Sequence, residues 1–342
     1  MSNLEYFFGK KINIKDYKGT SLKDIKKHSI DLKKSIKNFK KLDKYKKKIT
    51  KCILCNSSNL SKNFKILGTS YIQCLNCSHV TKDHYIPDQT MKTFFRDDKT
   101  VNSAHLNENS MRIKNIAYGK IKFFLKCIKK KDFKNCNWLD AGMGSGEILQ
   151  LIKSKGGDCY GFDVGKPGID VAVKQKLNNA YCSDVFDFYK IFKKNKLKKF
   201  DCISALGYLD VVSNPAKHLQ ILKRMLKVNG VIFLELPNYN SLTHTLIKSF
   251  PDQILRYFSL AQQSCYTEKS IRLFLKKNNF TSTHFWFFGL DFYQFLSTAT
   301  LLNNKKINTL KKMVDSDFNK MQFNIDNNRL SDNFIISAKK NK

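Results

Sequence analysis

The sequence predicts an α/β fold with a mostly parallel sheet. From residue 137 onward, short apolar runs alternate with helical stretches, which is typical of a parallel sheet with helices on both faces. Two identical Cys-x-x-Cys pairs and a Lys-rich stretch precede this region and indicate separate N-terminal segments. We expect, in chain order, a basic helical extension (1–50), a zinc-ribbon-like module (51–85), connecting helices (86–131) and the α/β domain (132–342).

The composition is that of a folded protein with reduced cysteines. Of the 342 residues, 42% are hydrophobic, which is enough for a sizeable core. No apolar run is long enough to cross a membrane, and the first residues lack the apolar core of a signal peptide. We therefore expect a cytoplasmic protein without a transmembrane segment, whose ten cysteines are thiols or metal ligands.

The net charge of +34 raises the question of a nucleic-acid partner. Only six of the 62 basic residues are Arg, although Arg matches phosphate geometry better than Lys. The sequence also lacks the signature of a common RNA-binding module. We interpret the lysines as a compositional bias, and nucleic-acid binding stays open as an alternative that we do not favour.

The Lys-rich stretch within 1–50 has apolar residues at roughly helical spacing, so we expect a basic amphipathic helix there. Such a helix either attaches to RNA or a membrane, or packs on the main body through its apolar stripe. We favour packing. The stripe consists of Ile25, Ile30 or Ser29, Leu32, Ile36, Phe39 and Leu42.

The two cysteine pairs have 18 residues between them, which matches the paired turns of a four-cysteine zinc site. Four thiolates complete a tetrahedral shell and leave no position for a substrate, so the zinc would be structural. His79 and His84 are then expected at the surface, since they are not needed as ligands. The expected ligands are Cys52, Cys55, Cys74 and Cys77.

The expected strands of the α/β domain are NWLD, DCYGFD, AYCSD, FDCISAL and GVIFLELPN, with THFWFFGLDFYQFL and DNFIISAKK as the last two candidates. A helix is expected after Asn214, because Pro215 suits a first helical position and Gly230 follows the apolar stripe. His218 lies in this helix, and we expect it at the surface.

A glycine-rich turn follows the first expected strand, in WLDAGMGSGE (138–147). A phosphate-binding P-loop is excluded because no Lys follows the glycines. A dinucleotide fingerprint would need a third glycine at the position of Glu147, where a carboxylate would instead oppose a pyrophosphate. The spacing is D-x-G-x-G-x-G, formed by Asp140, Gly142, Gly144 and Gly146.

This loop resembles that of the class I S-adenosylmethionine-dependent methyltransferases. The resemblance covers about 137–342 and implies a Rossmann-like domain with a mostly parallel seven-stranded sheet. In that family the strand-end acid and the glycine turn hold the methionine part of S-adenosylmethionine, whose sulfonium is a cation. The cysteine pairs resemble those of the subset with an N-terminal zinc module, many of which act on nucleotide-linked sugars or on polyketide-like or cell-surface polysaccharide precursors.

The resemblance also suggests site residues beyond the loop. Asp163 ends the second expected strand, where an acid can accept both ribose hydroxyls, so its loss should weaken cofactor binding with little effect on folding. Asp184 is expected near the adenine amino group, with Cys182 and Ser183 as neighbours that could contribute instead. Tyr208 and Asp210 follow the fourth strand and are our catalytic candidates. The histidine common in this segment of the family is missing, which leaves the general base unassigned.

The expected function is methyl transfer from S-adenosylmethionine to a small molecule or a sugar or polysaccharide precursor, such as a sugar nucleotide. One alternative is an RNA methyltransferase whose basic N-terminus and zinc module bind the nucleic acid. The other is a non-catalytic adaptor, which the intact glycine loop and Asp163 argue against.

Overall fold

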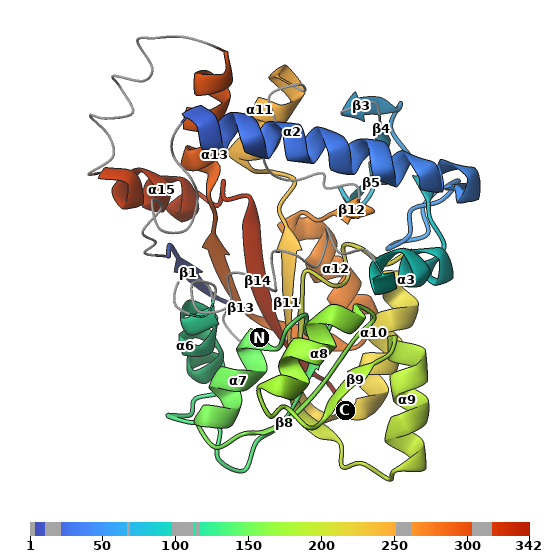
Figure 1. Ribbon diagram of the computed structural model, residues 1–342, viewed down its shortest axis with the longest axis vertical. Coiled ribbons are helices and arrows are strands. Elements are labelled where there is room, and N and C mark those ends of the chain that lie inside the picture. Colours follow the sequence, from blue (N-terminus) through green and yellow to red (C-terminus); the bar gives the residue numbers. More distant parts are fainter. Residues whose placement is uncertain are drawn as a thin grey trace.

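In the described residues the main sheet has eight strands, in the order β1-β13-β14-β11-β10-β7-β8-β9 (Figure 1). All neighbours are parallel except β14, which runs antiparallel to both β11 and β13. The strands are β1 (Glu5–Phe8), β7 (Asn137–Ala141), β8 (Asp158–Asp163), β9 (Ala180–Cys182), β10 (Phe200–Leu206), β11 (Leu226–Pro237), β13 (Phe280–Phe288) and β14 (Asn333–Lys340). The computed structural model describes residues 4–10, 22–66, 69–97, 113, 117–250, 261–302 and 317–342.

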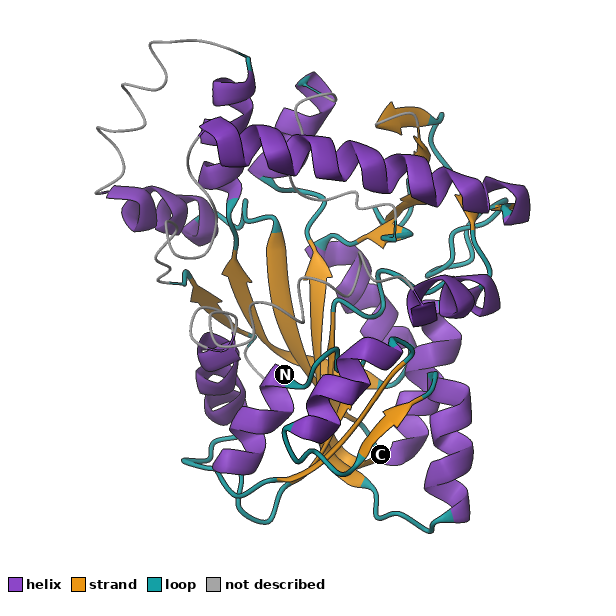
Figure 2. Cartoon of the chain, in the orientation of Figure 1, coloured by secondary structure: helices purple, strands orange, loops and turns teal. Residues whose placement is uncertain are grey.

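Helices cover both faces of this sheet, as the alternating pattern predicted (Figure 2). One face packs α6 (Tyr118–Cys127), α7 (Glu147–Ser154) and α8 (Lys166–Lys174) against side chains such as Trp138 and Phe233. These two rings stack with centroids 5.5 Å apart. The other face packs α9 (Val185–Lys194), α10 (Pro215–Met225) and α12 (Glu268–Lys277) on alternate residues of the same strands. The expectation of a mostly parallel α/β sheet is therefore confirmed.

The eighth strand, β1, comes from the segment that we expected to be only helical. It pairs in parallel with β13 at the edge of the sheet, with Glu5 opposite His284. Its side chains alternate between the faces. The Phe7 ring meets Phe123 edge-on at 5.6 Å, while Tyr6 stacks on Phe285 at 5.8 Å. Burial of aromatic rings on both faces explains why four residues suffice for a strand here.

The expected basic helix is α2 (Leu22–Phe39), followed by the short 3-10 helix η1 (Lys40–Tyr45). It packs against α13 (Asp291–Leu301) and lies along the upper side of the molecule in Figure 1. Ile25 and Ser29 are buried, whereas Ile30 is 53% exposed, so the apolar stripe runs through Ser29. Leu42 packs with Ile86. The side chains of Leu32, Ile36 and Phe39 lie outside the described part of the chain.

The cysteine pairs belong to a small antiparallel sheet of β3 (Phe64–Ile66), β4 (Thr69–Gln73), β5 (Val80–Lys82) and β12 (Ser264–Cys265). Its fourth strand, β12, lies between β11 and β13 in the sequence, and Ser264 pairs opposite Thr81. The strands β2 (Lys47–Lys48) and β6 (His84–Tyr85) flank the module in the sequence and form a separate two-stranded antiparallel sheet. The module therefore shares a sheet with the segment that links the last strands of the α/β domain.

Three further described helices are α3 (Asp88–Asp97), α11 (Leu242–Ser249) and α15 (Phe318–Asn327). They pack against other parts of the molecule: α3 contacts α8, α11 contacts α13, and α15 contacts α13, β1 and β13. No helix within the described ranges is long and apolar enough to cross a membrane.

Candidate active site

The glycine loop joins β7 to α7 and has three residues with positive φ. Gly142, Gly144 and Gly146 have φ angles of 73°, 55° and 81°, which side-chain-bearing residues rarely adopt. Space adds a second constraint at two of them. A Cβ on Gly142 would lie 2.9 Å from the Tyr208 ring, and one on Gly146 would lie 2.5 Å from Leu177. The loop is therefore fixed by backbone conformation and by the side chains against it.

Asp140, at the end of β7, is buried beneath this loop. Its Oδ1 accepts a 2.6 Å hydrogen bond from Ser204, whose Oγ in turn accepts one from the Trp138 indole at 2.9 Å. Burial raises the pKa of Asp140 to about 7, although the bond from Ser204 and the charge of Lys120 act the other way. A cation bound next to this carboxyl would favour its ionised form. Asp140 thus suits a positively charged ligand.

Asp163, at the end of β8, ties this strand to the glycine loop. Its Oδ2 accepts a hydrogen bond from the Gly144 N–H at 2.9 Å, and its Oδ1 accepts one from the Gly165 N–H at 2.7 Å. Two carboxylate oxygens can accept about four hydrogen bonds, so these contacts are compatible with ribose hydroxyls as further donors. Contrary to our expectation, Asp163 also has a structural role, because it holds the loop in place.

Asp184 begins α9 and is engaged on two sides. Its Oδ1 caps the helix by accepting from Phe186 N and Asp187 N, each at 2.9 Å, and its Oδ2 pairs with Lys92 of α3 at 2.7 Å. The neighbouring hydroxyl of Ser183 is buried and has no hydrogen-bond partner among the described residues. Ser183 is therefore the polar group beside Asp184 that most needs a ligand.

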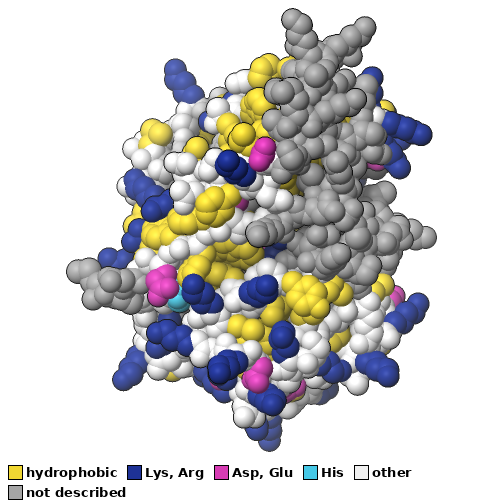
Figure 3. All heavy atoms as spheres, turned by 90° about the vertical axis from the view of Figure 1, so that its left-hand side faces the viewer, with side chains coloured by type: hydrophobic (Ala, Val, Ile, Leu, Met, Phe, Trp, Pro, Cys, Tyr) yellow, Lys and Arg dark blue, Asp and Glu magenta, His cyan; other side chains and the backbone are white. Residues whose placement is uncertain are grey.

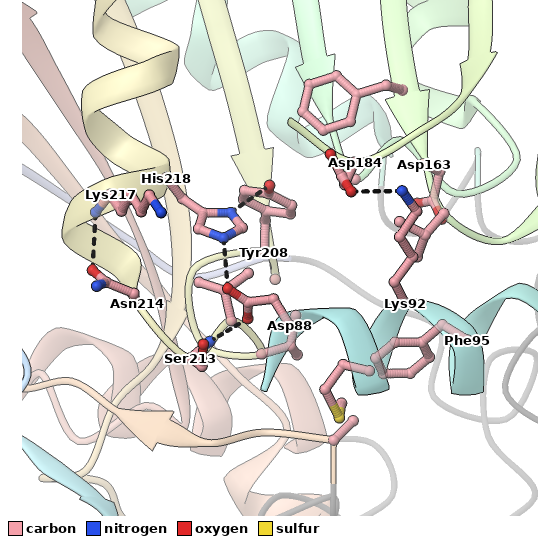
Figure 4. A pocket seen from close by; sticks show the side chains of 18 of the residues that line it. Asp88, Lys92, Phe95, Asp163, Asp184, Tyr208, Ser213, Asn214, Lys217 and His218 are labelled. Atoms are coloured by element: carbon pink, nitrogen blue, oxygen red, sulfur yellow. Dashed lines mark hydrogen bonds and ion pairs between the residues drawn. The ribbon is translucent and has the colours of Figure 1, made fainter. Parts of the chain in front are cut away.

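These residues meet in a cavity of 1180 Å³ at the carboxyl ends of the strands (Figure 4). The cavity lies between the glycine loop, α3 and the first cysteine pair of the small module. Asp140, Gly142, Gly144, Asp163, Asp184 and Tyr208 all line it.

Two predicted residues do not line the cavity. Gly146 ends the glycine turn with a positive φ and immediately precedes α7. Asp210 is buried elsewhere, where its Oδ2 accepts from Gln262 at 3.0 Å and burial raises its pKa to about 7.

Sequence reasoning missed a buried histidine at the cavity wall. His218 is 3% exposed, so our placement of this residue at the surface was wrong. Its Nδ1 lies 2.8 Å from the Tyr208 hydroxyl and its Nε2 lies 3.0 Å from Asp88 Oδ2 (Figure 4). The helical stripe through Leu219 and Leu222 includes position 218 and could have predicted its burial. No sequence signal identified Asp88.

The four cysteines of the small module converge on one point. Their sulfur atoms all lie within 4.8 Å of one another, with Cys52 to Cys77 at 3.6 Å and Cys55 to Cys74 at 3.5 Å. Four Zn–S bonds of about 2.3 Å in a tetrahedron would place the sulfurs about 3.8 Å apart. The cluster therefore has the donors and the size that a tetrahedral zinc ion requires.

The two cysteine turns have the same backbone geometry, which supports a shared ligand. In the first, the Cys52 N–H donates to Ser57 O and the Asn56 N–H donates to Cys52 O, both at 2.8 Å. In the second, the Cys74 N–H donates to His79 O and the Ser78 N–H donates to Cys74 O, again at 2.8 Å. The residue after each pair has a φ of 64°.

Neither nearby histidine belongs to the group of side chains that could hold the metal. His79 is buried, contrary to our expectation, and its ring packs on Tyr266 with centroids 4.8 Å apart. Burial lowers the pKa of His79 to about 3, so the ring stays neutral. His84 is partly exposed and pairs with Asp83 at 2.8 Å.

Residues 111–284 match the family model described as "Methyltransferase domain". The chain belongs to this methyltransferase family. A ubiquinone biosynthesis O-methyltransferase of Pelagibacter ubique is 24% identical to our methyltransferase over 216 residues, which are 61% of this chain and 87% of that protein. A ribosomal protein L11 methyltransferase of Fusobacterium nucleatum is 33% identical over 115 residues, covering 32% of this chain and 35% of that protein.

Among solved structures, the magnesium protoporphyrin IX methyltransferase of Synechocystis PCC 6803 with bound SAH is similar, with 12% identity and a TM-score of 0.48. The match covers 74% of this chain and 99% of that chain. Together with its fold and family, the glycine loop identifies the protein as an S-adenosylmethionine-dependent methyltransferase.

We predict that Asp163→Ala weakens binding of S-adenosylmethionine by about ten- to a hundredfold, because hydrogen bonds to a charged group contribute roughly 1.5–3 kcal/mol. Calorimetry measures the affinity. Because Asp163 also accepts from the Gly144 and Gly165 N–H groups, we expect a lower melting temperature as well.

The matched control is Asp158→Ala, which removes an exposed carboxylate at the other end of β8 and should leave the affinity unchanged. NAD is the control ligand and should not bind. Wild-type affinity in Asp163→Ala, or binding of NAD in place of S-adenosylmethionine, would contradict the assignment.

Proposed function

We propose that this methyltransferase transfers the methyl group of S-adenosylmethionine to a small acceptor held between the glycine loop and the cysteine module. Acceptors of the class of sugar nucleotides or other sugar or polysaccharide precursors fit this proposal. The observation that supports it most directly is the large cavity formed jointly by these two parts of the molecule. Its volume of 1180 Å³ exceeds the upper end, about 1,000 Å³, of the range typical of a drug-sized ligand, so it has room for a second small molecule.

The lining of the cavity carries charges of both signs. Asp140 and Asp163 end β7 and β8 and Glu147 begins α7, and their carboxylates would stabilise a sulfonium cation and an amino group. Lys120, whose charge acts on Asp140, lines the cavity as well and pairs with Glu235.

Lys47 and Lys51 line a second side of the cavity, next to the first cysteine pair. An acceptor that carries phosphate or carboxylate would suit this second side.

Several apolar side chains from the N-terminal segments enclose the acceptor side. Ile53 and Leu54 come from the first cysteine turn, and Met91 and Phe95 come from α3. Enclosure of this kind holds a small acceptor close to the donor, which is what an in-line displacement requires most. It also keeps water away from the reacting groups. The similarity to O-methyltransferases of ubiquinone biosynthesis supports a hydroxyl group as the methyl acceptor.

We propose the following roles for the site residues. Asp140, Gly142, Gly144 and Gly146 would hold the methionine part of the cofactor, Asp163 the ribose, and Asp184 with Ser183 the adenine. Tyr208 would contact the acceptor. Asp210, which we expected there as well, has no part in this proposal because it does not line the cavity.

Transfer of a labelled methyl group tests this function. The purified chain is incubated with methyl-tritiated S-adenosylmethionine and three separate acceptor sets: sugar nucleotides, dihydroxybenzoates and bulk tRNA. We expect label in a small acceptor and inhibition by S-adenosylhomocysteine, because product and donor occupy the same loop. Label found only in tRNA would contradict the proposal and support the RNA alternative.

We further propose that Cys52, Cys55, Cys74 and Cys77 bind one structural zinc ion. The metal would hold the first cysteine turn, and hence Ile53 and Leu54, in place at the cavity wall. Four cysteine ligands leave no open coordination position, so the ion would take no direct part in the reaction.

Metal analysis should find one zinc per chain, and Cys74→Ser should release it with a loss of folding stability. The matched control is Cys182→Ser, which removes an exposed thiol outside the module and should retain the metal. A zinc-free wild-type protein that is fully folded would contradict a structural metal.

The high net charge is the observation that favours the RNA alternative. On the face shown in Figure 3, Lys and Arg side chains are spread over the surface and do not form one stripe. We predict that binding to tRNA is non-specific and falls steeply between about 50 and 200 mM salt, because it depends on release of counterions. A salt titration by filter binding measures this. Nanomolar binding to one RNA that persists at about 200 mM salt would support the alternative instead.

A further inference from the structure

Three side chains from separate elements form a hydrogen-bonded chain along the cavity wall (Figure 4). Tyr208 follows β10, His218 lies on α10 and Asp88 begins α3. The Tyr208 hydroxyl is 2.8 Å from His218 Nδ1, and His218 Nε2 is 3.0 Å from Asp88 Oδ2. Asp88 is fixed in turn by the Ser213 N–H, which donates to its Oδ1 at 2.6 Å.

The partners determine which nitrogen of a neutral His218 carries the proton. An ionised carboxylate only accepts hydrogen bonds, so Nε2 must donate to Asp88. Nδ1 is then the acceptor for the Tyr208 O–H. Burial raises the pKa of Asp88, but its bonds to His218 and Ser213 outweigh this and keep the pKa below its usual value. The carboxylate is therefore charged when the imidazole is neutral.

The tyrosine end of the chain lies next to the site for the methyl donor. A Cβ at Gly142 would come within 2.9 Å of the Tyr208 ring, so the ring rests on the first glycine of the loop. Gly207, just before it, has no atom within 4 Å of its Cβ position and faces open space. An acceptor bound in this space would lie beside both the glycine loop and Tyr208.

Groups from three elements face the His218 ring. Asp88 faces it from α3, the Tyr208 hydroxyl faces it from the end of β10, and the Phe186 ring of α9 covers it edge-on at 5.1 Å. On its own helix, the Lys217 ammonium is turned to the Phe186 ring, 5.2 Å from its centroid. Burial, with the charges of Asp88, Asp184 and Asp163, raises the pKa of Tyr208, so the phenol stays protonated and passes a proton on without storing charge.

We propose that Tyr208, His218 and Asp88 form a proton relay that removes the proton of a hydroxyl acceptor during methyl transfer. This inference rests on the proposed function and names the general base that the sequence left unassigned. Tyr208 contacts the acceptor, His218 takes up the proton, and Asp88 is a positioning residue that stabilises the resulting imidazolium.

The step balances in atoms and charge. The acceptor oxygen forms a bond to the methyl carbon as the carbon–sulfur bond breaks, and the electron pair stays on sulfur as a neutral thioether. The acceptor proton passes to the Tyr208 oxygen while the Tyr208 proton passes to His218 Nδ1. One positive charge disappears at sulfur and one appears at the imidazole next to Asp88. The imidazolium returns its proton to water after the product leaves.

A purely structural role is the rival explanation, because Asp88 also fixes α3 over the cavity. α3 has a second attachment one turn later, where Lys92 pairs with Asp184 and Asp187 at 2.7 Å each. Lys92→Met releases that attachment without touching the relay. It is therefore the matched comparison for substitutions in the relay.

The first test needs no acceptor. Nitrogen NMR of the full chain, labelled with ¹⁵N-histidine and bound to S-adenosylhomocysteine, reports the tautomer of His218, assigned with His218→Gln. We expect a neutral ring protonated at Nε2, and we expect Asp88→Asn to change the tautomer ratio. A ring protonated at Nδ1 has no site to receive the Tyr208 proton and would overturn the relay.

The second test measures methyl transfer to 3,4-dihydroxybenzoate as a function of pH. We expect His218→Gln and Tyr208→Phe each to lower kcat by about a hundredfold, the lower end of general-base effects, with cofactor affinity within twofold of wild type. The acid limb of the pH profile should disappear in His218→Gln and remain in Lys92→Met. Equal losses with unchanged profiles in all three variants would show that the chain of side chains only holds α3.

Calorimetry separates the two levels of the argument. A wild-type chain that fails to bind S-adenosylmethionine would refute the proposed function itself. Normal binding combined with the wrong tautomer, or with full activity in His218→Gln, would refute the relay alone.

Discussion

The carboxylate of Asp163 holds together the part of the molecule on which the site depends. It accepts from the N–H groups of Gly144 and Gly165, so one side chain joins the glycine loop to the end of β8. Each of these contacts is a charge-assisted hydrogen bond, which is shorter and stronger than a neutral one. The loop cannot rely on side chains of its own, because three of its residues are glycines with positive φ. Its shape is imposed from the neighbouring strand.

The rest of the cavity is assembled from segments that are far apart in the sequence. α3 is attached to the α/β domain through Asp88 on one side and through Lys92 on the other. The hydrogen bonds from Lys92 and Lys190 lower the pKa of Asp187 to about 2, so the Asp187 carboxylate of this attachment is ionised at neutral pH. β12 contributes the fourth strand of the cysteine module. The cavity is thus closed by contacts between segments that are far apart in the sequence.

The sequence predicted the features that depend on local spacing. The cysteine pairs, the glycine loop and the alternation of strands and helices are patterns within some tens of residues, and they appear in the structure as expected with one exception. The expected strand THFWFFGLDFYQFL ends at Phe288, and its second half begins the helix α13 at Asp291. The residues that were misplaced depend on distant partners. β1 is four residues long and becomes a strand only because β13, almost 280 positions later, offers an open edge.

His79 and His218 illustrate the same limit at single side chains. His218 is buried because Asp88, 130 positions earlier in the chain, supplies a partner for a ring that would otherwise prefer water. His79 is buried against the ring of Tyr266, and its ring has no hydrogen-bond partner in the part of the chain that the structure describes. Asp210 was placed at the right strand end, but its side chain turns to Gln262 and away from the cavity. Strand ends can be predicted from sequence, whereas side-chain directions at those ends cannot.

The strand β12 has a consequence for how this architecture can evolve. A module whose sheet is completed by Ser264 and Cys265 is not inherited as one continuous cassette. Recombination that exchanged only the N-terminal part between two relatives would leave an open strand edge in the module and an unpaired segment after α11. The module and the segment around β12 are therefore expected to be inherited together.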